Sequence, residues 1–171
     1  MPTIIFSHGK DSEPWGGKIV AMAEVARRRG LTVDSIDYRG IDDPLARVAK
    51  LEGACKQLSE APILVGSSMG GYVSAAVSAK LPTKAMFLLA PAFFMPGYEQ
   101  YTPVPASCPI AIVHGWNDDI VPVENSIRFA QLYKSALHIL DSDHRLTADI
   151  VQICELFDAF LGRVLADRSN T

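Results

Sequence analysis

The sequence predicts an α/β protein, a three-layer α/β/α sandwich in which a mainly parallel six-stranded sheet lies between helices. Three observations lead to this fold class. Apolar runs of strand length alternate with longer amphipathic stretches of helix length. Glycine or proline follows several of these stretches, where a chain turns. Strands that alternate with helices are typical of βαβ units, whose strands run parallel.

The first expected elements are a strand, a helix and a strand. Thr3–Phe6 is a short β-type run. Gly17–Arg29 has a helical pattern and ends at Gly30, the residue type favoured just after a helix. Its basic residues 27–29 then form a last helical turn, where cations are favourable, rather than a nucleic-acid site. Thr32–Asp37 alternates as a strand does.

The middle of the chain predicts a helix, a strand and a second helix. Pro44–Ser59 is helical, and its first proline suits a first turn. Pro62–Gly66 is a compact apolar strand. Met69–Leu81 is rich in small residues and helical, and Pro82 ends it.

The last elements complete the sheet. Ala85–Ala90 and Pro109–Val113 are apolar on both faces, as central parallel strands are. Val123–Lys134 is predicted to be a helix, Ala136–Leu140 a strand, and Leu146–Leu165 the closing helix.

Composition favours one domain over residues 1–171, with 49% hydrophobic and 20% charged residues. The formal net charge of -3 argues against a nucleic-acid partner. No apolar run reaches the about 20 residues of a membrane span, and the N-terminus lacks the pattern of a secretory signal. The scattered cysteines, without metal or redox spacing, indicate reduced thiols and a cytoplasmic protein; they are Cys55, Cys108 and Cys154.

Polar clusters follow four of the predicted strands. Ligands of parallel sheets bind at the carboxyl ends of the strands, so these clusters are expected to meet at one edge. The clusters lie at residues 8–10, 67–69, 116–119 and 143–144.

Ser68 is the candidate nucleophile. It follows an apolar strand and precedes a helix, the context of a strained turn that exposes a serine. Residues two before and two after such a serine must be small, and Gly66 and Gly70 satisfy this around Ser68. Centring the turn on Ser67 would place Val65 and Met69 there, so Ser67 is the weaker alternative.

His144 is the expected base, because a serine hydroxyl is a poor nucleophile until a base removes its proton. It follows the last strand and precedes the closing helix. His138 lies within a strand, and His8 and His114 each precede a glycine at a strand end. We interpret the last two as structural residues that orient loops.

Asp118 is the preferred acid to orient the base, and its neighbour Asp119 stays open as an alternative. Both follow the fifth strand. When a serine attacks a carbonyl group, an oxyanion develops, and two backbone N–H groups would stabilise it here, those of Lys10 and Met69. Lys10 follows the strand-end sequence His8-Gly9, and Met69 follows the nucleophile.

These motifs together resemble the α/β-hydrolase superfamily, over about residues 3–165. The strand-end His-Gly, the Gly-x-Ser-x-Gly turn, the His-Gly-x-x-Asp-x-x-Val-Pro segment and a late Asp-His all match, in the superfamily's order of Ser68, Asp118 and His144. The chain looks most like small bacterial esterases and thioesterases. It starts directly at the His-Gly strand, and residues 91–108 are too few for a folded cap.

The resemblance implies a catalytic triad of Ser68, Asp118 and His144 and an oxyanion hole of Lys10 and Met69. It implies the sheet order 2-1-3-4-5-6 and no metal or organic cofactor. The expected reaction is hydrolysis of small-acyl carboxylic esters through an acyl-enzyme. Thioesters or amides are alternative substrates, and a non-catalytic binding domain of this fold is a further alternative.

The segment of residues 92–101 is rich in large apolar groups after the fourth predicted strand. Phe93 and Phe94 are therefore candidates to wall an acyl pocket, and the competing interpretation is that they only cover the core. The expected partner is a small-molecule ester or thioester. The sequence does not single out an oligomeric state.

Overall fold

The computed structural model describes residues 1–96 and 102–167. Six strands form one sheet in the order β2-β1-β3-β4-β5-β6, and every neighbouring pair is parallel. This confirms the predicted fold class and the predicted sheet order. The strands are β1 (Ile4–Ser7), β2 (Val33–Ile36), β3 (Ile63–Ser67), β4 (Ala85–Leu89), β5 (Ile110–Gly115) and β6 (Ala136–Leu140).

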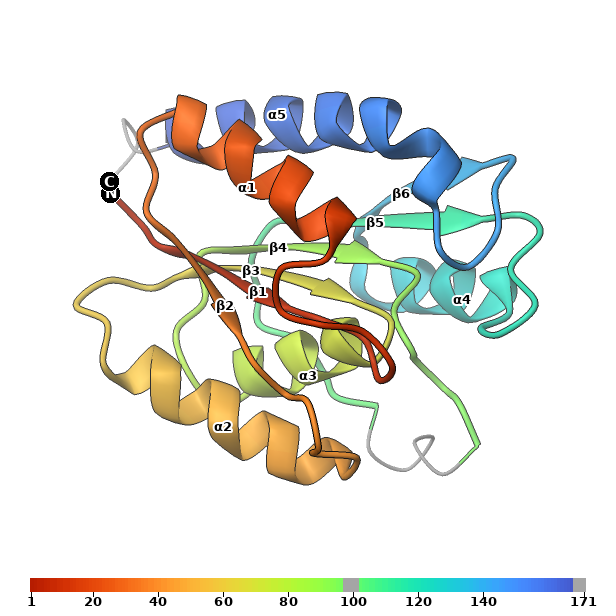
Figure 1. Ribbon diagram of the computed structural model, residues 1–171, viewed down its shortest axis with the longest axis horizontal. Helices are drawn as coiled ribbons and strands as arrows, with labels where there is room; N and C mark the ends of the chain where they lie inside the picture. Colours follow the sequence, from red (N-terminus) through yellow and green to blue (C-terminus); the bar gives the residue numbers. More distant parts are fainter. Residues whose placement is uncertain (97–101, 168–171) are drawn as a thin grey trace.

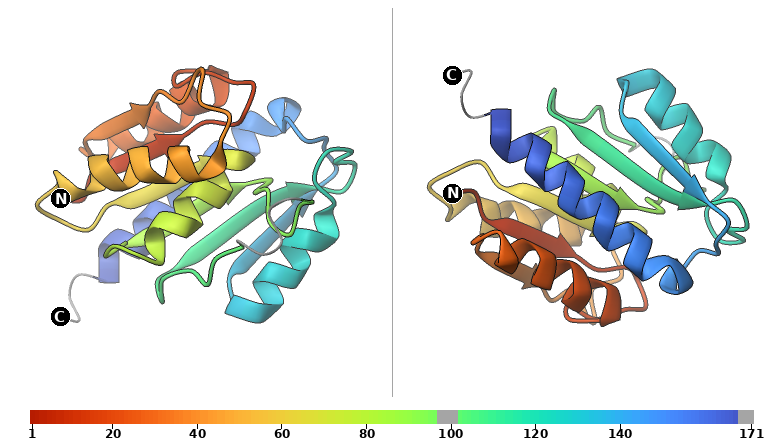
Figure 2. Two further views of the ribbon diagram at one scale, coloured as in Figure 1. Left: turned by 90° about the horizontal axis from the view of Figure 1, so that it is seen from below. Right: turned by 90° about the horizontal axis from the view of Figure 1, so that it is seen from above.

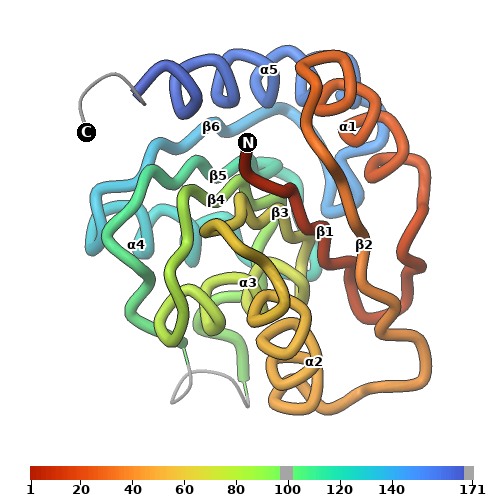
Figure 3. The backbone as a smooth tube through the Cα atoms, turned by 90° about the vertical axis from the view of Figure 1, so that its left-hand side faces the viewer, coloured from red at the N-terminus to blue at the C-terminus, as the bar shows by residue number. Residues whose placement is uncertain are grey.

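Helices cover both faces of the sheet (Figure 1). Seen end-on, α1 and α5 lie on one side of it, and α2, α3 and α4 on the other (Figure 3). From above, α1 and α5 both run over the sheet (Figure 2). The helices are α1 (Gly17–Arg28), α2 (Pro44–Lys56), α3 (Met69–Ser78), α4 (Val123–Tyr133) and α5 (Ile150–Ala166), with the short 3₁₀ helix η2 (Thr147–Asp149) before the last.

The sheet divides the buried side chains into two clusters. Successive side chains of a strand point to opposite faces, so Ile63 and Val65 pack with α1 and α5, whereas Leu64 packs with α2 and α3. All five residues of β4 are buried, as expected of a central parallel strand.

Local chemistry explains where α2 begins. Pro44 occupies its first turn, and the side chain of Asp43 accepts a hydrogen bond from the backbone N–H of Leu45 at 3.3 Å. The predicted start of this helix is therefore confirmed, and α2 itself ends at Lys56, three residues before the predicted end at Ser59.

The predicted start of the closing helix at Leu146 is wrong. Leu146 has a left-handed backbone conformation with φ 59°, which a right-handed helix does not include. The carboxylate of Asp143 accepts hydrogen bonds from the N–H groups of Arg145 and Leu146, both at 3.1 Å. A turn therefore forms first, and α5 begins at Ile150.

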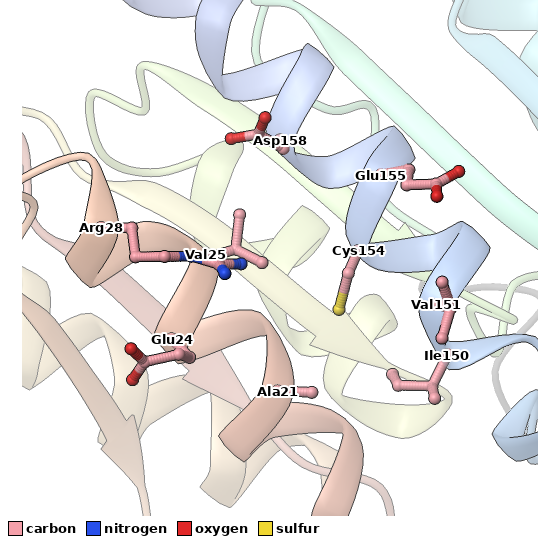
Figure 4. A pocket seen from close by; sticks show the side chains of 9 residues that line it. All are labelled: Ala21, Glu24, Val25, Arg28, Ile150, Val151, Cys154, Glu155 and Asp158. Atoms are coloured by element: carbon pink, nitrogen blue, oxygen red, sulfur yellow. The ribbon is translucent and has the colours of Figure 1, made fainter.

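A hollow of about 460 Å³ lies between α1 and α5, where Val25 and Cys154 face each other across the two helices (Figure 4). Charged side chains of both helices, among them Glu24, Arg28 and Asp158, also line it. None of its lining residues is among the predicted site residues, so this hollow and the strand-end site are separate features.

Candidate active site

Ser68 lies at the sharp turn between β3 and α3. Its backbone has φ 54° and ψ −116°, a conformation that a residue with a side chain rarely adopts. The turn is held by hydrogen bonds at both sides of the serine. Its N–H donates to the carbonyl of Leu89 at 2.9 Å, and its carbonyl accepts from the N–H groups of Gly71 and Ala92, both at 3.0 Å.

The glycines around Ser68 are required by close backbone contacts. A Cβ on Gly66 would lie 2.2 Å from the carbonyl oxygen of Gly70, and a Cβ on Gly70 would lie 1.9 Å from that of Ser7. Neither approach leaves room for a methyl group. The turn is thus centred on Ser68, as the spacing of the glycines predicts, and Ser67 is the last residue of β3.

His144 connects Ser68 to Asp118 through two hydrogen bonds. Its Nε2 lies 3.1 Å from Ser68 Oγ, and its Nδ1 lies 2.7 Å from Asp118 Oδ2. A carboxylate only accepts, so Nδ1 carries the proton and Nε2 is free to accept from the serine hydroxyl. The structure therefore brings together three residues that the sequence places 26 and 76 positions apart.

The Asp118 side chain is fully buried, and both of its oxygens are hydrogen-bonded. Oδ1 accepts from the backbone N–H groups of Ile120 at 2.9 Å and Val121 at 2.8 Å. Burying a carboxylate is costly unless such donors compensate it. Asp119 is exposed, so of the two neighbouring acids it is Asp118 that contacts His144.

His114 also contacts Asp118, which the sequence interpretation did not anticipate. Its Nε2 lies 3.0 Å from Asp118 Oδ2 and 2.9 Å from the carbonyl of Val121, so that nitrogen carries a proton. Its Nδ1 accepts from Ser126 Oγ at 2.7 Å. Burial lowers the pKa of His114 and keeps the ring neutral. The feature of the sequence that could have indicated this contact is a histidine at a strand end, four residues before Asp118.

Two loops carry Asp118 and His144, and they touch at Gly115. A Cβ there would lie 2.2 Å from the carbonyl oxygen of Ser142. The N–H of Asn117 donates to the same carbonyl at 3.0 Å, and the N–H of Trp116 donates to that of Leu140 at 2.8 Å. This contact fixes the loop after β5 against the loop after β6, where His144 lies.

The predicted oxyanion-hole residues lie on either side of the serine. Met69 is the first residue of α3, so its N–H is one of those at a helix N-terminus that lack a partner within the helix. Lys10 follows Gly9, whose Cα position is so close to the turn that a Cβ would lie 3.5 Å from Ser68 Cβ. Both backbone segments therefore adjoin the serine.

Phe93 and Phe94 take different positions. Phe93 is fully buried and stacks on Phe129 with ring centroids 4.0 Å apart, so in this structure it covers the core. Phe94 is half-buried, and the guanidinium of Arg128 lies 3.9 Å from the centre of its ring. Residues 97–101 of the apolar segment lie outside the described residues.

The described ranges contain neither a metal site nor a membrane span. Within residues 1–96 and 102–167, no three side chains of His, Cys, Asp or Glu gather as a metal site. In the same ranges no helix is both long and apolar enough to cross a membrane.

Comparison with known proteins agrees with the fold. A crystal structure from Xanthomonas campestris pv. campestris, named "a putative hydrolase of the alpha/beta superfamily", is 32% identical, covers 95% of this chain and 99% of that chain, and superposes with a TM-score of 0.86. Est1E from Butyrivibrio proteoclasticus is 20% identical, with coverage of 96% and 88% and a TM-score of 0.84. The rat mitochondrial palmitoyl-protein thioesterase ABHD10 is 25% identical, over 92% of this chain and 74% of its own length.

The fold and the relatives define the class as an α/β-hydrolase, and they support a hydrolase activity. Within that class, residues 3–104 match the sequence family described as "Uncharacterised protein family (UPF0227)". The chain belongs to this family.

Proposed function

We propose that this protein is a serine hydrolase that cleaves carboxylic esters of small acyl groups. The observation that carries the proposal is the continuous chain of hydrogen bonds from Ser68 through His144 to Asp118. A serine, a neutral histidine and a buried carboxylate in this order are the parts of a catalytic triad. Ser68 would be the nucleophile, His144 the base and Asp118 the residue that orients it.

The proposed reaction has two steps. Ser68 Oγ attacks the ester carbonyl carbon while its proton passes to Nε2 of His144, and the backbone N–H groups of Lys10 and Met69 hold the oxyanion. The alcohol leaves with the proton from His144, and the acyl group stays on Ser68. A water then attacks the acyl-enzyme, gives its proton to His144, and the carboxylic acid leaves as the proton returns to Ser68.

A small acyl group is supported by the short connection between β4 and β5. Residues 90–109 leave no room for a cap domain that would enclose a long chain. Phe94, half-buried at the start of this connection, is the remaining candidate for an apolar wall. Phe93 would act only indirectly, by holding the segment on the core.

A thioesterase activity is the second candidate. It is favoured by the similarity to ABHD10, which is named a palmitoyl-protein thioesterase. The same triad serves both leaving groups, because the acyl-enzyme is the same. The geometry of the three residues favours a binding domain without catalysis less, whereas an amidase would use the same triad and stays an alternative.

The remaining features of the proposal follow the sequence. We infer a single domain over residues 1–171 that acts on small molecules, without nucleic-acid or membrane partners and without a cofactor. We also infer a cytoplasmic location. The relative ABHD10, by contrast, is named as a mitochondrial protein.

The test is a panel of p-nitrophenyl esters and acyl thioesters of increasing chain length. We expect kcat/KM to be highest for the shortest acyl groups and to fall at least about 1,000-fold in Ser68→Ala. Preference for long chains would contradict the small-acyl assignment, and faster turnover of thioesters would make the thioesterase the better assignment. Hydrolysis that survives in Ser68→Ala would contradict the triad.

A further inference from the structure

Arg47 of α2 is buried, with 1% of its surface exposed, and its guanidinium holds the segment that follows β1. Nη1 donates to the carbonyls of His8 at 3.3 Å and Gly9 at 3.2 Å, and Nη2 donates to that of Lys10 at 3.2 Å. Nε donates to the carbonyl of Ile41 at 2.7 Å. One side chain thus binds three consecutive carbonyls of residues 8–10, which we call the oxyanion loop.

We propose that Arg47 is a positioning residue for the oxyanion hole. The proposal rests on the serine-hydrolase function proposed above. Arg47 lies on α2, outside all the sequence motifs, and in this proposal it orients the Lys10 N–H toward the oxyanion.

Peptide geometry connects the arginine to that N–H. The peptide between Gly9 and Lys10 is trans, since the described residues contain no cis peptide bond. In a trans peptide the carbonyl and the following N–H point in opposite directions. Holding the Gly9 carbonyl toward Arg47 therefore turns the Lys10 N–H away from the arginine. Gly9 itself adjoins Ser68, because a Cβ at position 9 would lie 3.5 Å from Ser68 Cβ.

A second donor supports the same carbonyl. Nδ1 of His8 lies 2.7 Å from Gly9 O, and Nε2 of His8 accepts from the N–H of Tyr38 at 2.9 Å. The ring is therefore neutral, with its proton on Nδ1, and burial lowers its pKa. The guanidinium of Arg47 also lies 5.1 Å from the centre of the Tyr38 ring. The loop is held from two directions.

The chemistry of this contact requires arginine. Its planar guanidinium has five N–H donors in a fixed arrangement, and four carbonyls on two segments use them here. A lysine has three donors on one nitrogen atom and cannot cover carbonyls spread over both segments. Arg47→Lys should keep the charge and the aliphatic stem but lose the defined geometry of the loop.

The experiment compares wild type, Arg47→Lys and Arg47→Gln, with Arg29→Lys as the matched control. Arg29 makes an ion pair with Asp158 on α5, on the other face of the sheet. Active sites are counted by titration with a fluorophosphonate, and kcat and KM for p-nitrophenyl acetate are expressed per titrated site. Thermal unfolding establishes that each variant is folded.

We expect kcat per titrated site to fall about 10- to 100-fold in Arg47→Lys, with KM nearly unchanged, because a displaced donor loses part of the about 100- to 1,000-fold that a whole oxyanion donor contributes. Affinity for a boronic acid, whose adduct with serine is a tetrahedral anion, should fall by a similar factor. Arg47→Gln should behave in the same way, and Arg29→Lys should match wild type.

A merely structural role gives a different result. The titratable fraction would then fall while kcat per titrated site and boronic-acid affinity stay at their wild-type values, and this would overturn the proposal. If Arg47→Lys does not fold, the same criteria apply to Arg47→Gln. A wild type that is not titrated at all would overturn the proposed function itself, and with it the role given to Arg47.

Discussion

Ser68 combines a strained backbone with the side chain that we propose as the nucleophile. A positive φ at a residue with a side chain costs of order 1–3 kcal/mol, and the surrounding structure must compensate it. Here the compensation comes from backbone hydrogen bonds to Leu89, Gly71 and Ala92. The conformation lifts the serine out of the strand, so that its hydroxyl can reach His144.

The glycine at position 70 should be indispensable for this turn. In Gly70→Ala the new methyl group would lie 1.9 Å from the carbonyl oxygen of Ser7. This oxygen belongs to the backbone of β1, so it can move away only at a high cost in free energy. We expect the free energy of unfolding to fall by about 3 kcal/mol or more, measured by urea denaturation. Gly53→Ala is the matched control, because a Cβ at this position in α2 meets nothing within 4 Å. It should raise stability by about 0.5–1 kcal/mol. Equal effects at the two sites would contradict the account.

The sequence predicted Ser68, His144 and Asp118 because each carries a local signal. The proposed nucleophile lies between correctly spaced glycines, and the proposed acid and base each follow a strand. Arg47 carries no such signal. Its role depends on how closely α2 approaches the loop after β1, and that distance is a property of the packed structure. Likewise, the sequence indicates only that His114 orients a loop, because its direct contact with Asp118 arises from the packing of the folded chain.

At the scale of elements, β4 and α5 form the centre of one face of the core. Phe87 of β4 is fully buried, and its ring lies 5.1 Å from that of Phe157 and 5.4 Å from that of Phe160. The strand that precedes Ser68, β3, pairs directly with β4. Packing of β4 against α5 therefore supports β3 and, with it, the turn at Ser68.

Truncating Phe87 should test that support. We expect Phe87→Ala to lower the free energy of unfolding by about 3–5 kcal/mol, because it leaves a cavity in a buried aromatic cluster. Chemical denaturation with urea measures the change. Val151→Ala on the same helix layer is the control, since Val151 is 72% exposed, and its effect should stay within about 0.5 kcal/mol. A loss below about 1 kcal/mol in Phe87→Ala would show that the cluster contributes little.

Element ends were predicted less well than the elements themselves. Within residues 1–96 and 102–167, the strands and α-helices lie where hydrophobic patterns indicated them. The start of α5 was missed because Asp143, an acidic residue interpreted only as a neighbour of His144, binds the N–H groups of Arg145 and Leu146. Side-chain hydrogen bonds to the backbone compete with helix formation, and apolar periodicity does not record them.

At the scale of the whole molecule, acid should destabilise the fold through its histidines. Burial lowers the pKa of His8, His114 and His138 below 6.5. The unfolded chain therefore binds protons more readily than the folded chain. The stability due to the neutral rings is fully present above about pH 6.5 and is lost as the pH falls from there toward the folded pKa values.

Urea denaturation at about pH 7.5 and about pH 5.5 tests this linkage. We expect a lower free energy of unfolding at the acidic pH, and a smaller difference between the two in His138→Gln, which removes one of the three groups. A stability that rises on acidification would contradict the assignment of neutral histidines whose pKa is lowered by burial.

The whole-molecule architecture was predictable because parallel sheets follow strict rules. The family resemblance implies the strand order 2-1-3-4-5-6, which the structure confirms. The same rules place the carboxyl ends of β1, β3, β5 and β6 at one edge, and the candidate site lies there. Substrate preference does not follow from these rules, because sheet topology does not specify the side chains that would contact the acyl group.

Covalent labelling with a fluorophosphonate probe tests the central claim most directly. The probe reacts with activated serines, and the modified peptide is mapped in wild type, Ser68→Ala and Ser67→Ala. We predict that wild type and Ser67→Ala are labelled on Ser68 and that Ser68→Ala is not labelled. A folded wild-type protein that remains unlabelled, or a label on any other residue, would contradict the proposal that Ser68, His144 and Asp118 form a working catalytic triad.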